Sequence, residues 1–258
     1  MKSLRILALF ALLCVSCVTA AYASINSTGL STQQQIQPHP VIQVGACRIL
    51  WFGIAQDLEL ARLASIGIVP TQTTNPADIN PANLANYDVL VVAYTGPGVI
   101  GANQAAIAAF VAADNGLLIH QPEHAGVIDY APAGFGLEIT DICWCGGCNQ
   151  FGATIVNGAH PITSGFADAD LAGDFDTAAN LGGSYTVLAT NATCTSNPSL
   201  AAGTFGTGRV VFETGNASTL SFDPGSDAYW ARIFEYLCVG SQTPTADPTW
   251  GRLKVLYR

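Results

Sequence analysis

The chain has 258 residues, half of them hydrophobic, and a net charge of −9 that results from nine Lys and Arg against 18 Asp and Glu. Residues 41–240 contain 17 carboxylates and only four cations, which are Arg48, Arg62, Arg209 and Arg232. A surface of this sign repels polyanions, which excludes nucleic acid and anionic membranes as partners. The length is sufficient for one large domain with its own hydrophobic core.

The first residues have the pattern of a secretory signal peptide. Lys2 and Arg5 precede the apolar run 6–18, and Ala21-Tyr22-Ala23 is a small-x-small cleavage site. The apolar run is too short to cross a bilayer comfortably, so we expect no membrane span. Residues 1–23 are therefore predicted to be removed, and the mature protein to be secreted, periplasmic or at the cell surface.

Two polar segments bound the predicted domain. Residues 24–43 and 241–248 are rich in Ser, Thr, Gln and Pro, which is typical of linkers, and they enclose a domain at 44–240. The tail 249–258 carries three cations, and Trp250, Leu253 and Leu256 would share one side of a short helix, which is marginal alone. The tail is expected to dock on its own domain or on a docking or sorting partner, or to stay without fixed structure.

Between the linkers, apolar strands alternate with helices. In chain order, the hydrophobic pattern predicts a strand at 47–53, a helix at 55–67, a weaker strand at 68–73, a short helix or turn at 80–87, a strand at 88–96, a helix at 101–116 and a strand at 117–122. Further strands separated by turns are predicted within 153–166, 185–194 and 206–216, and a closing helix at 223–238. This alternation predicts an α/β fold whose parallel sheet is covered on both faces.

The order of these segments resembles the class I glutamine amidotransferase-like superfamily, and within it the trehalose-utilisation-type and related bacterial domains. The similarity covers roughly residues 45–240, and its most specific part is His160-Pro161-Ile162-Thr163-Ser164-Gly165. The resemblance implies a flavodoxin-like, doubly wound, mostly parallel sheet in a three-layer sandwich. It implies less about function, because one fold hosts many activities.

Polar residues at the carboxyl ends of the predicted strands form the leading candidate site, because ligands of open α/β sheets bind at that edge. The candidate acids and bases are His120, Glu123 and Glu213, and the candidate ligand-binding residues are Tyr94, His120, Glu123, His124 and Trp144. The competing interpretation is that these are ordinary polar residues at the starts of loops.

The catalytic nucleophile of the resembling superfamily is missing. Its members place a Cys on the tight turn after the strand that Leu117–His120 matches, whereas this chain has Gln121-Pro122 there. Since a nucleophile needs a reactive atom and an adjacent base, the resemblance carries over the fold and not the catalytic triad.

A metal site is a weaker alternative at the same position. Residues 120–124, HQPEH, match the H-x-x-E-H pattern of some zinc proteases. That pattern requires a helix that places both His on one face, and Pro122 within a segment that follows a strand opposes a helix. His120 and His124 remain weak metal candidates, and we expect no cofactor.

The mature chain has six cysteines, an even number in an oxidising compartment, which favours disulfides. They are Cys47, Cys143, Cys145, Cys148, Cys194 and Cys238. The resembling fold places the first strand's start and the last helix's end together, which implies a Cys47–Cys238 pair. The other four cysteines would form two disulfides, and the sequence leaves open which cysteine pairs with which. Thiol–disulfide exchange at Cys145 and Cys148, or a zinc site completed by Cys194, are the less favoured alternatives.

The sequence therefore favours a non-catalytic function. We expect an exported, disulfide-stabilised binding or accessory module for a small polar or carbohydrate-like ligand. Carbohydrate is suggested by the family resemblance and by Trp51, Tyr94 and Trp144 near the candidate loops. The alternatives are a hydrolase that uses His and Glu at the strand ends, with or without a metal, and a thiol–disulfide exchange protein.

Overall fold

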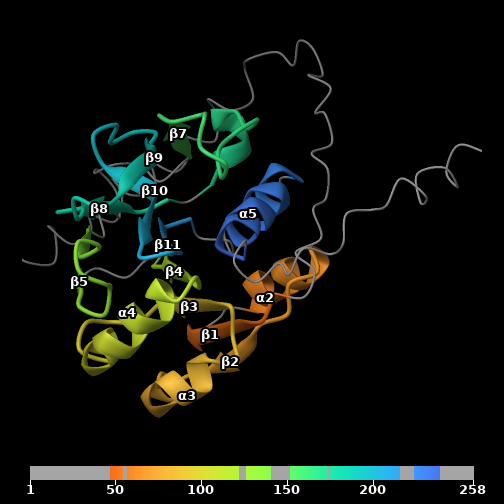
Figure 1. The fold of residues 1–258 in the computed structure, drawn as a ribbon. Coiled ribbons are helices and arrows are strands. Elements are labelled where there is room, and N and C mark those ends of the chain that lie inside the picture. Colours follow the sequence, from red (N-terminus) through yellow and green to blue (C-terminus); the bar gives the residue numbers. More distant parts are fainter. Residues whose placement is uncertain are drawn as a thin grey trace, which may run out of the picture. The chain divides into compact units, whose positions relative to one another are not determined.

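The computed structural model describes residues 47–54, 57–121, 126–140, 152–173, 175–215 and 224–238. Its main feature is an eight-stranded sheet in the order β2-β1-β3-β4-β11-β10-β9-β7 (Figure 1). The strands are β1 (Ile49–Gly53), β2 (Thr71–Thr73), β3 (Val89–Ala93), β4 (Gly116–His120), β7 (Ala153–Ile155), β9 (Thr186–Asn191), β10 (Pro198–Phe205) and β11 (Gly208–Glu213). The first five strands in this order pair in parallel and the last three are antiparallel.

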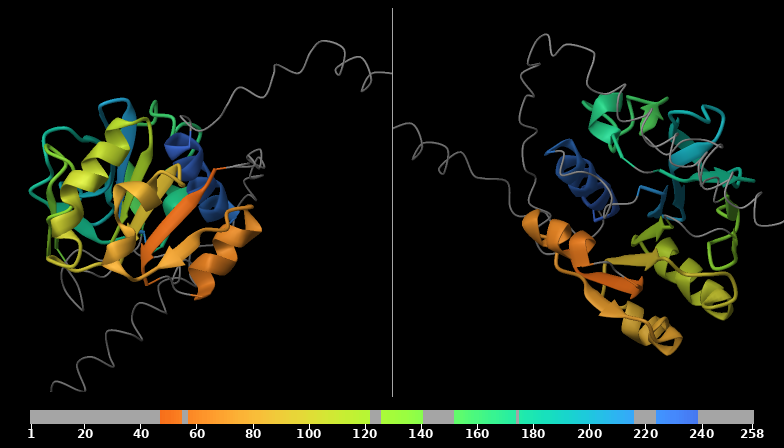
Figure 2. Two further views of the ribbon diagram at one scale, coloured as in Figure 1. Left: turned by 60° about the horizontal axis from the view of Figure 1, so that its bottom comes forward. Right: turned by 180° about the vertical axis from the view of Figure 1, so that it is seen from behind.

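Helices cover both faces of the sheet, as Figure 2 shows. They are α2 (Asp57–Ser65), α3 (Pro81–Leu84), α4 (Gln104–Ala112) and α5 (Pro224–Leu237). Alternate residues of each strand point to opposite faces, so Trp51 belongs to the core under α2 and α5, and Phe52 to the core under α3 and α4. This arrangement confirms the predicted flavodoxin-like α/β fold with three layers.

A second, three-stranded sheet packs into the core on the α4 side. It consists of β5 (Gly126–Ile128), β6 (Leu137–Thr140) and β8 (Thr177–Ala179) in the order β5-β6-β8. Ile128, Leu137 and Ala178 are buried in the same cluster as Phe110 of α4. The sequence pattern did not predict this sheet, because its strands are only three or four residues long.

Local signals explain where several elements begin and end. The side chain of Asn80 accepts a hydrogen bond from the Asn83 N–H at 3.0 Å, and Pro81 occupies the first turn of α3. The helix predicted at 101–116 ends earlier, since α4 stops at Ala112 and Asp114 adopts a positive φ of 70°. The HPITSG segment forms a turn after the short strand β7.

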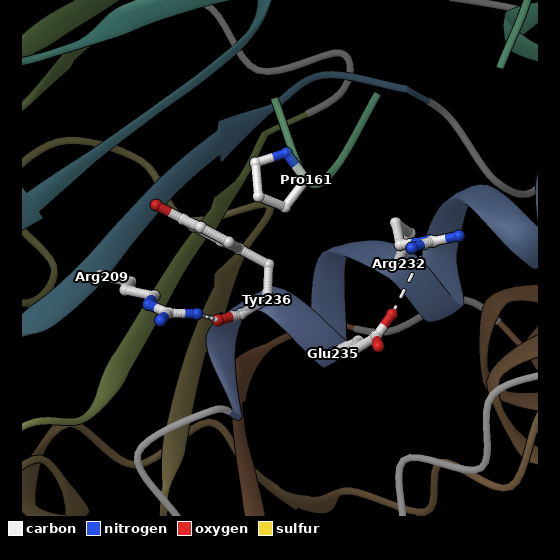
Figure 3. A pocket seen from close by; sticks show the side chains of 5 residues that line it. All are labelled: Pro161, Arg209, Arg232, Glu235 and Tyr236. Carbon is white, nitrogen blue, oxygen red and sulfur yellow. Dashed lines mark hydrogen bonds and ion pairs between the residues drawn. The ribbon is translucent and has the colours of Figure 1, made fainter. Parts of the chain in front are cut away.

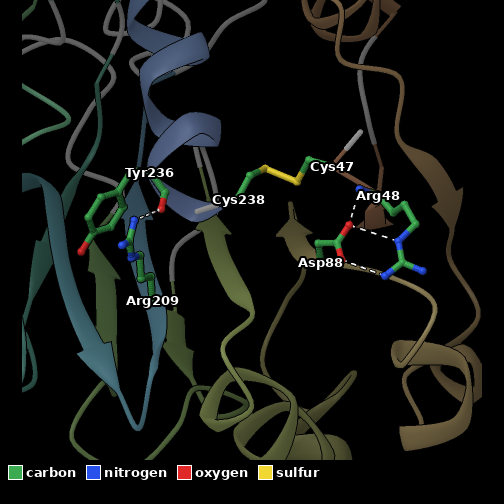
Figure 4. Close-up of a disulfide and its surroundings, with 6 residues drawn as sticks. All are labelled: Cys47, Arg48, Asp88, Arg209, Tyr236 and Cys238. Carbon is green, nitrogen blue, oxygen red and sulfur yellow. Dashed lines mark hydrogen bonds and ion pairs between the residues drawn. A yellow bond between two sulfur atoms is a disulfide. The ribbon is translucent and has the colours of Figure 1, made fainter. Parts of the chain in front are cut away.

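The predicted disulfide between Cys47 and Cys238 is confirmed. It links the residues just before β1 and just after α5, with a Cα–Cα distance of 5.9 Å and a sequence separation of 191 (Figure 4). Cys194 is also disulfide-bonded. The pairing of Cys143, Cys145 and Cys148 lies outside the described residues.

Candidate functional site

The last residues of β4 and β11 bring two predicted site residues together. His120 and Glu213 are opposite each other in the parallel pairing of these strands, and both point to the α5 face. The distance from His120 Nδ1 to Glu213 Oε2 is 2.8 Å. Both side chains are completely buried, with 0% exposure, although the sequence analysis expected them to line a crevice. The pair therefore lies inside the core, below the sheet edge.

Aromatic rings surround the imidazole. The ring centroids of Trp51, Tyr94 and Trp230 lie 5.9, 5.6 and 5.0 Å from that of His120, each in an edge-on or T-shaped arrangement. Trp230 belongs to α5, so this helix closes the site from above. Among the described residues, the buried indole N–H groups of Trp51 and Trp230 have no hydrogen-bond partner. The sequence analysis missed Trp230, whose signal was an aromatic residue on the buried face of a helix.

The second oxygen of Glu213 is also engaged. Oε1 accepts hydrogen bonds from the Gly215 N–H at 2.6 Å and from the Tyr229 hydroxyl at 3.2 Å. Burial raises the pKa of Glu213, while its hydrogen bonds to His120 and these two donors act in the opposite direction. A Cβ on Gly215 would lie 2.3 Å from Oε1, so only Gly permits this close approach. Both carboxyl oxygens of Glu213 therefore interact with groups of the protein itself.

Gln121 occupies the position after β4 where the resembling superfamily has its nucleophile. Its Oε1 accepts a hydrogen bond from the Thr95 N–H at 3.0 Å, and its Nε2 lies 3.0 Å from the Tyr130 hydroxyl. The side chain is completely buried. Gln121 thus links the ends of β3 and β4 through hydrogen bonds, and its amide does not provide a nucleophile.

The carboxyl ends of β1 and β3 form the rim of the candidate site. The order β2-β1-β3 places the topological switch point between these two strands, which is where ligands of doubly wound folds bind. Tyr94 has a φ of 47°, an unusual value for a non-glycine residue, and its side chain is half-buried. Its backbone N–H donates to the His120 carbonyl at 3.2 Å. Such backbone outliers concentrate at functional sites.

The remaining predicted residues divide into two groups. Glu123, His124 and Trp144 lie outside the described residues. His160 is described, and its Nδ1 accepts a hydrogen bond from the Ile162 N–H at 3.2 Å, which supports the structural role favoured by its Pro-containing turn. Within the described residues, no cluster of His, Cys, Asp and Glu is suited to a metal ion. None of the described helices has the length and apolar character needed to cross a membrane.

The strand order defines a doubly wound, flavodoxin-like α/β fold, and comparison with solved structures supports this fold class. A cytoplasmic protein from Salmonella typhimurium, STM3548, aligns with a TM-score of 0.53 and 14% identity over 74% of this chain and 98% of its own. A protein described as ThuA-like from Bacteroides uniformis aligns with a TM-score of 0.50 and 11% identity, over 74% and 90% of the two chains.

A third similar structure, from Thermoplasma acidophilum, is described as belonging to a GMP synthase. It aligns with a TM-score of 0.50 and 14% identity, over 72% of this chain and 92% of its own. At these identities the similarity establishes the fold alone. The sequence matches no family model and no curated protein.

Proposed function

We propose that this protein is an exported, non-catalytic binding module for a small polar or carbohydrate-like ligand. The proposal rests on the burial and the hydrogen bonds of the residues at the end of β4. His120 is buried against Glu213, and both ends of the Gln121 amide are hydrogen-bonded within the protein. A general acid or base must reach the substrate, directly or through one water, and these side chains are occupied inside the core.

The same edge remains suited to binding. Tyr94 lies at the switch point of the sheet, half-buried, and beside the residues 95–98 that follow β3. An aromatic side chain with a polar tip combines apolar contact with hydrogen bonding, which is useful for sugar rings. The resemblance to trehalose-utilisation-type domains favours a carbohydrate-like ligand, and a protein described as ThuA-like has a similar fold.

The test is a glycan-array screen followed by titration calorimetry on the strongest hit. We expect Tyr94→Ala to weaken binding by about tenfold or more, which corresponds to roughly 1.4 kcal/mol. Tyr87→Ala is the matched control, because Tyr87 is also half-buried and precedes β3 at the opposite end of that strand. Equal affinity in both variants, or release of product from the bound ligand, would contradict the proposal.

A further inference from the structure

A second concave surface lies at the opposite edge of the sheet. Arg209, near the start of β11, pairs in register with Gly116 at the start of β4, so it marks the amino-terminal edge of the parallel strands. Together with Pro161, Arg232, Glu235 and Tyr236 it lines a pocket of about 260 Å³ (Figure 3). Tyr94 lies beyond the carboxyl end of β3 and is therefore not part of this pocket.

The pocket concentrates positive charge in a protein that has little of it. Of the four cations within residues 41–240, Arg48 pairs with Asp88 at 2.8 Å and Arg62 pairs with Asp227 at 2.5 Å. The other two, Arg209 and Arg232, line the same pocket, and Arg232 pairs there with Glu235 at 3.7 Å. Two cations against one carboxylate give this pocket a net positive charge on a domain with 17 carboxylates, which favours a small anion.

Arg209 is held in a fixed orientation. Its guanidinium carbon lies 4.6 Å from the centroid of the Tyr236 ring, and Nη1 donates a hydrogen bond to the Tyr236 carbonyl at 2.5 Å. The disulfide at Cys238 fixes the end of α5 two residues further on (Figure 4). An arginine that stacks on an aromatic ring keeps further N–H donors in a rigid plane, which suits a carboxylate.

The opposite wall carries the ion pair of Arg232 and Glu235. Arg232 Nε lies 3.7 Å from Glu235 Oε2, beyond hydrogen-bond distance. Within the described part of the chain, Glu235 Oε2 is buried without a hydrogen-bond partner. The Glu235 side chain as a whole is 31% exposed, so its carboxylate can accept a hydrogen bond from a ligand hydroxyl. Pro161 and the ring of Tyr236 supply apolar surface beside these polar groups.

We propose that this pocket binds a small hydroxylated carboxylate of the sugar-acid class. Arg209 binds the carboxylate, Arg232 and Glu235 on the opposite wall contact the ligand hydroxyls, and the carbon skeleton packs against Pro161 and Tyr236. The volume lies just below the about 300–1,000 Å³ that is usual for sites of drug-sized ligands, so a single sugar acid is the suitable size. This site is independent of the rim proposed above.

The test is titration calorimetry of the mature full-length chain with glucuronate, glucose and acetate in low-salt buffer, because salt screens such contacts. We expect glucuronate to bind more tightly than either glucose or acetate. Arg232→Gln should weaken glucuronate binding about tenfold through the loss of a charge-assisted contact. The matched control Arg48→Gln removes the same charge from the Asp88 pair and should leave binding unchanged.

Two further variants locate the contacts. Glu235→Gln should reduce the preference for glucuronate over acetate, and Tyr94→Ala should not alter glucuronate binding. The proposal is overturned if glucose binds as well as glucuronate, if glucuronate does not bind, or if Arg232→Gln behaves like Arg48→Gln. Loss of glucuronate binding in Tyr94→Ala also overturns it, since the ligand would then bind at the rim. Thermal unfolding of each variant checks that it is folded.

Discussion

Replacing Glu213 by Leu tests whether the buried pair is a structural element. The substitution removes the partner of His120 and leaves the Gly215 N–H and the Tyr229 hydroxyl without their acceptor. Each buried group left unsatisfied costs about 1–3 kcal/mol, and removing one member of a buried pair typically costs about 3–5 kcal/mol in total. We expect a loss of about 3–5 kcal/mol, because contributions within one network do not add.

The measurement is urea unfolding followed by tryptophan fluorescence, since Trp51 and Trp230 lie beside the pair. Thermal unfolding should show a decrease of roughly 6–20 °C, at about 2–4 °C per kcal/mol for a domain of this size. Glu138→Leu is the matched control, because Glu138 is only partly buried and accepts a hydrogen bond from Asn180 at 2.8 Å. A loss below about 1 kcal/mol for Glu213→Leu, or one equal to the control, would refute this reasoning.

Three further predictions concern stability. Cys47→Ser should lower the free energy of unfolding, measured in urea, by about 2–5 kcal/mol, because the disulfide closes a very long loop. Since this variant lacks the Cys47–Cys238 disulfide, reductant should not destabilise it further through this pair. Gly215→Ala should cost about 1–3 kcal/mol since the new Cβ meets Glu213 Oε1, whereas Gly183→Ala, with open space around it, should be nearly neutral by the same assay. Burial raises the pKa of Glu213 above its unfolded value, so the folded state retains a proton that the unfolded state releases. Stability should therefore fall as pH rises from the unfolded Glu value of about 4.3 towards the folded pKa, and Glu213→Gln should lack this slope in denaturation measured across pH.

The sequence predicted the parallel half of the fold well because its strands are continuously apolar. β1, β3 and β4 are almost entirely buried, and such runs need no tertiary information to be recognised. The small sheet was missed because its pairing is non-local, with Glu138 opposite Ala179. A strand of three residues has too few positions to show a period.

The sequence identified His120 and Glu213 as candidate site residues but not how deeply they are buried. The spacing did contain the missing information, since His120 follows Leu118 and Glu213 follows Val211 by two residues, which places each polar residue on the face of its buried predecessor. What the sequence could not provide was the helix above that face. Tyr229 and Trp230 of α5 complete the site from residues more than a hundred positions after His120.

The position of the pair suggests a role beyond stability, because well-packed apolar residues often replace a buried ion pair at little cost. Glu213 holds the Gly215 N–H, and the His120 ring packs edge-on against the Tyr94 ring at a centroid distance of 5.6 Å, so the pair connects the core to both strand ends. The double variant His120→Leu/Glu213→Leu should be about 1–2 kcal/mol more stable than Glu213→Leu alone, because it no longer buries an imidazole that has lost its carboxylate.

The double variant should nevertheless bind the ligand of the Tyr94 rim more weakly than the native protein, because the Tyr94 ring loses the imidazole that packs against it. Titration with the glycan found by array screening measures this effect, and Glu138→Leu is again the control. Unchanged affinity in the double variant would show that the pair does not support the rim and that it serves folding alone.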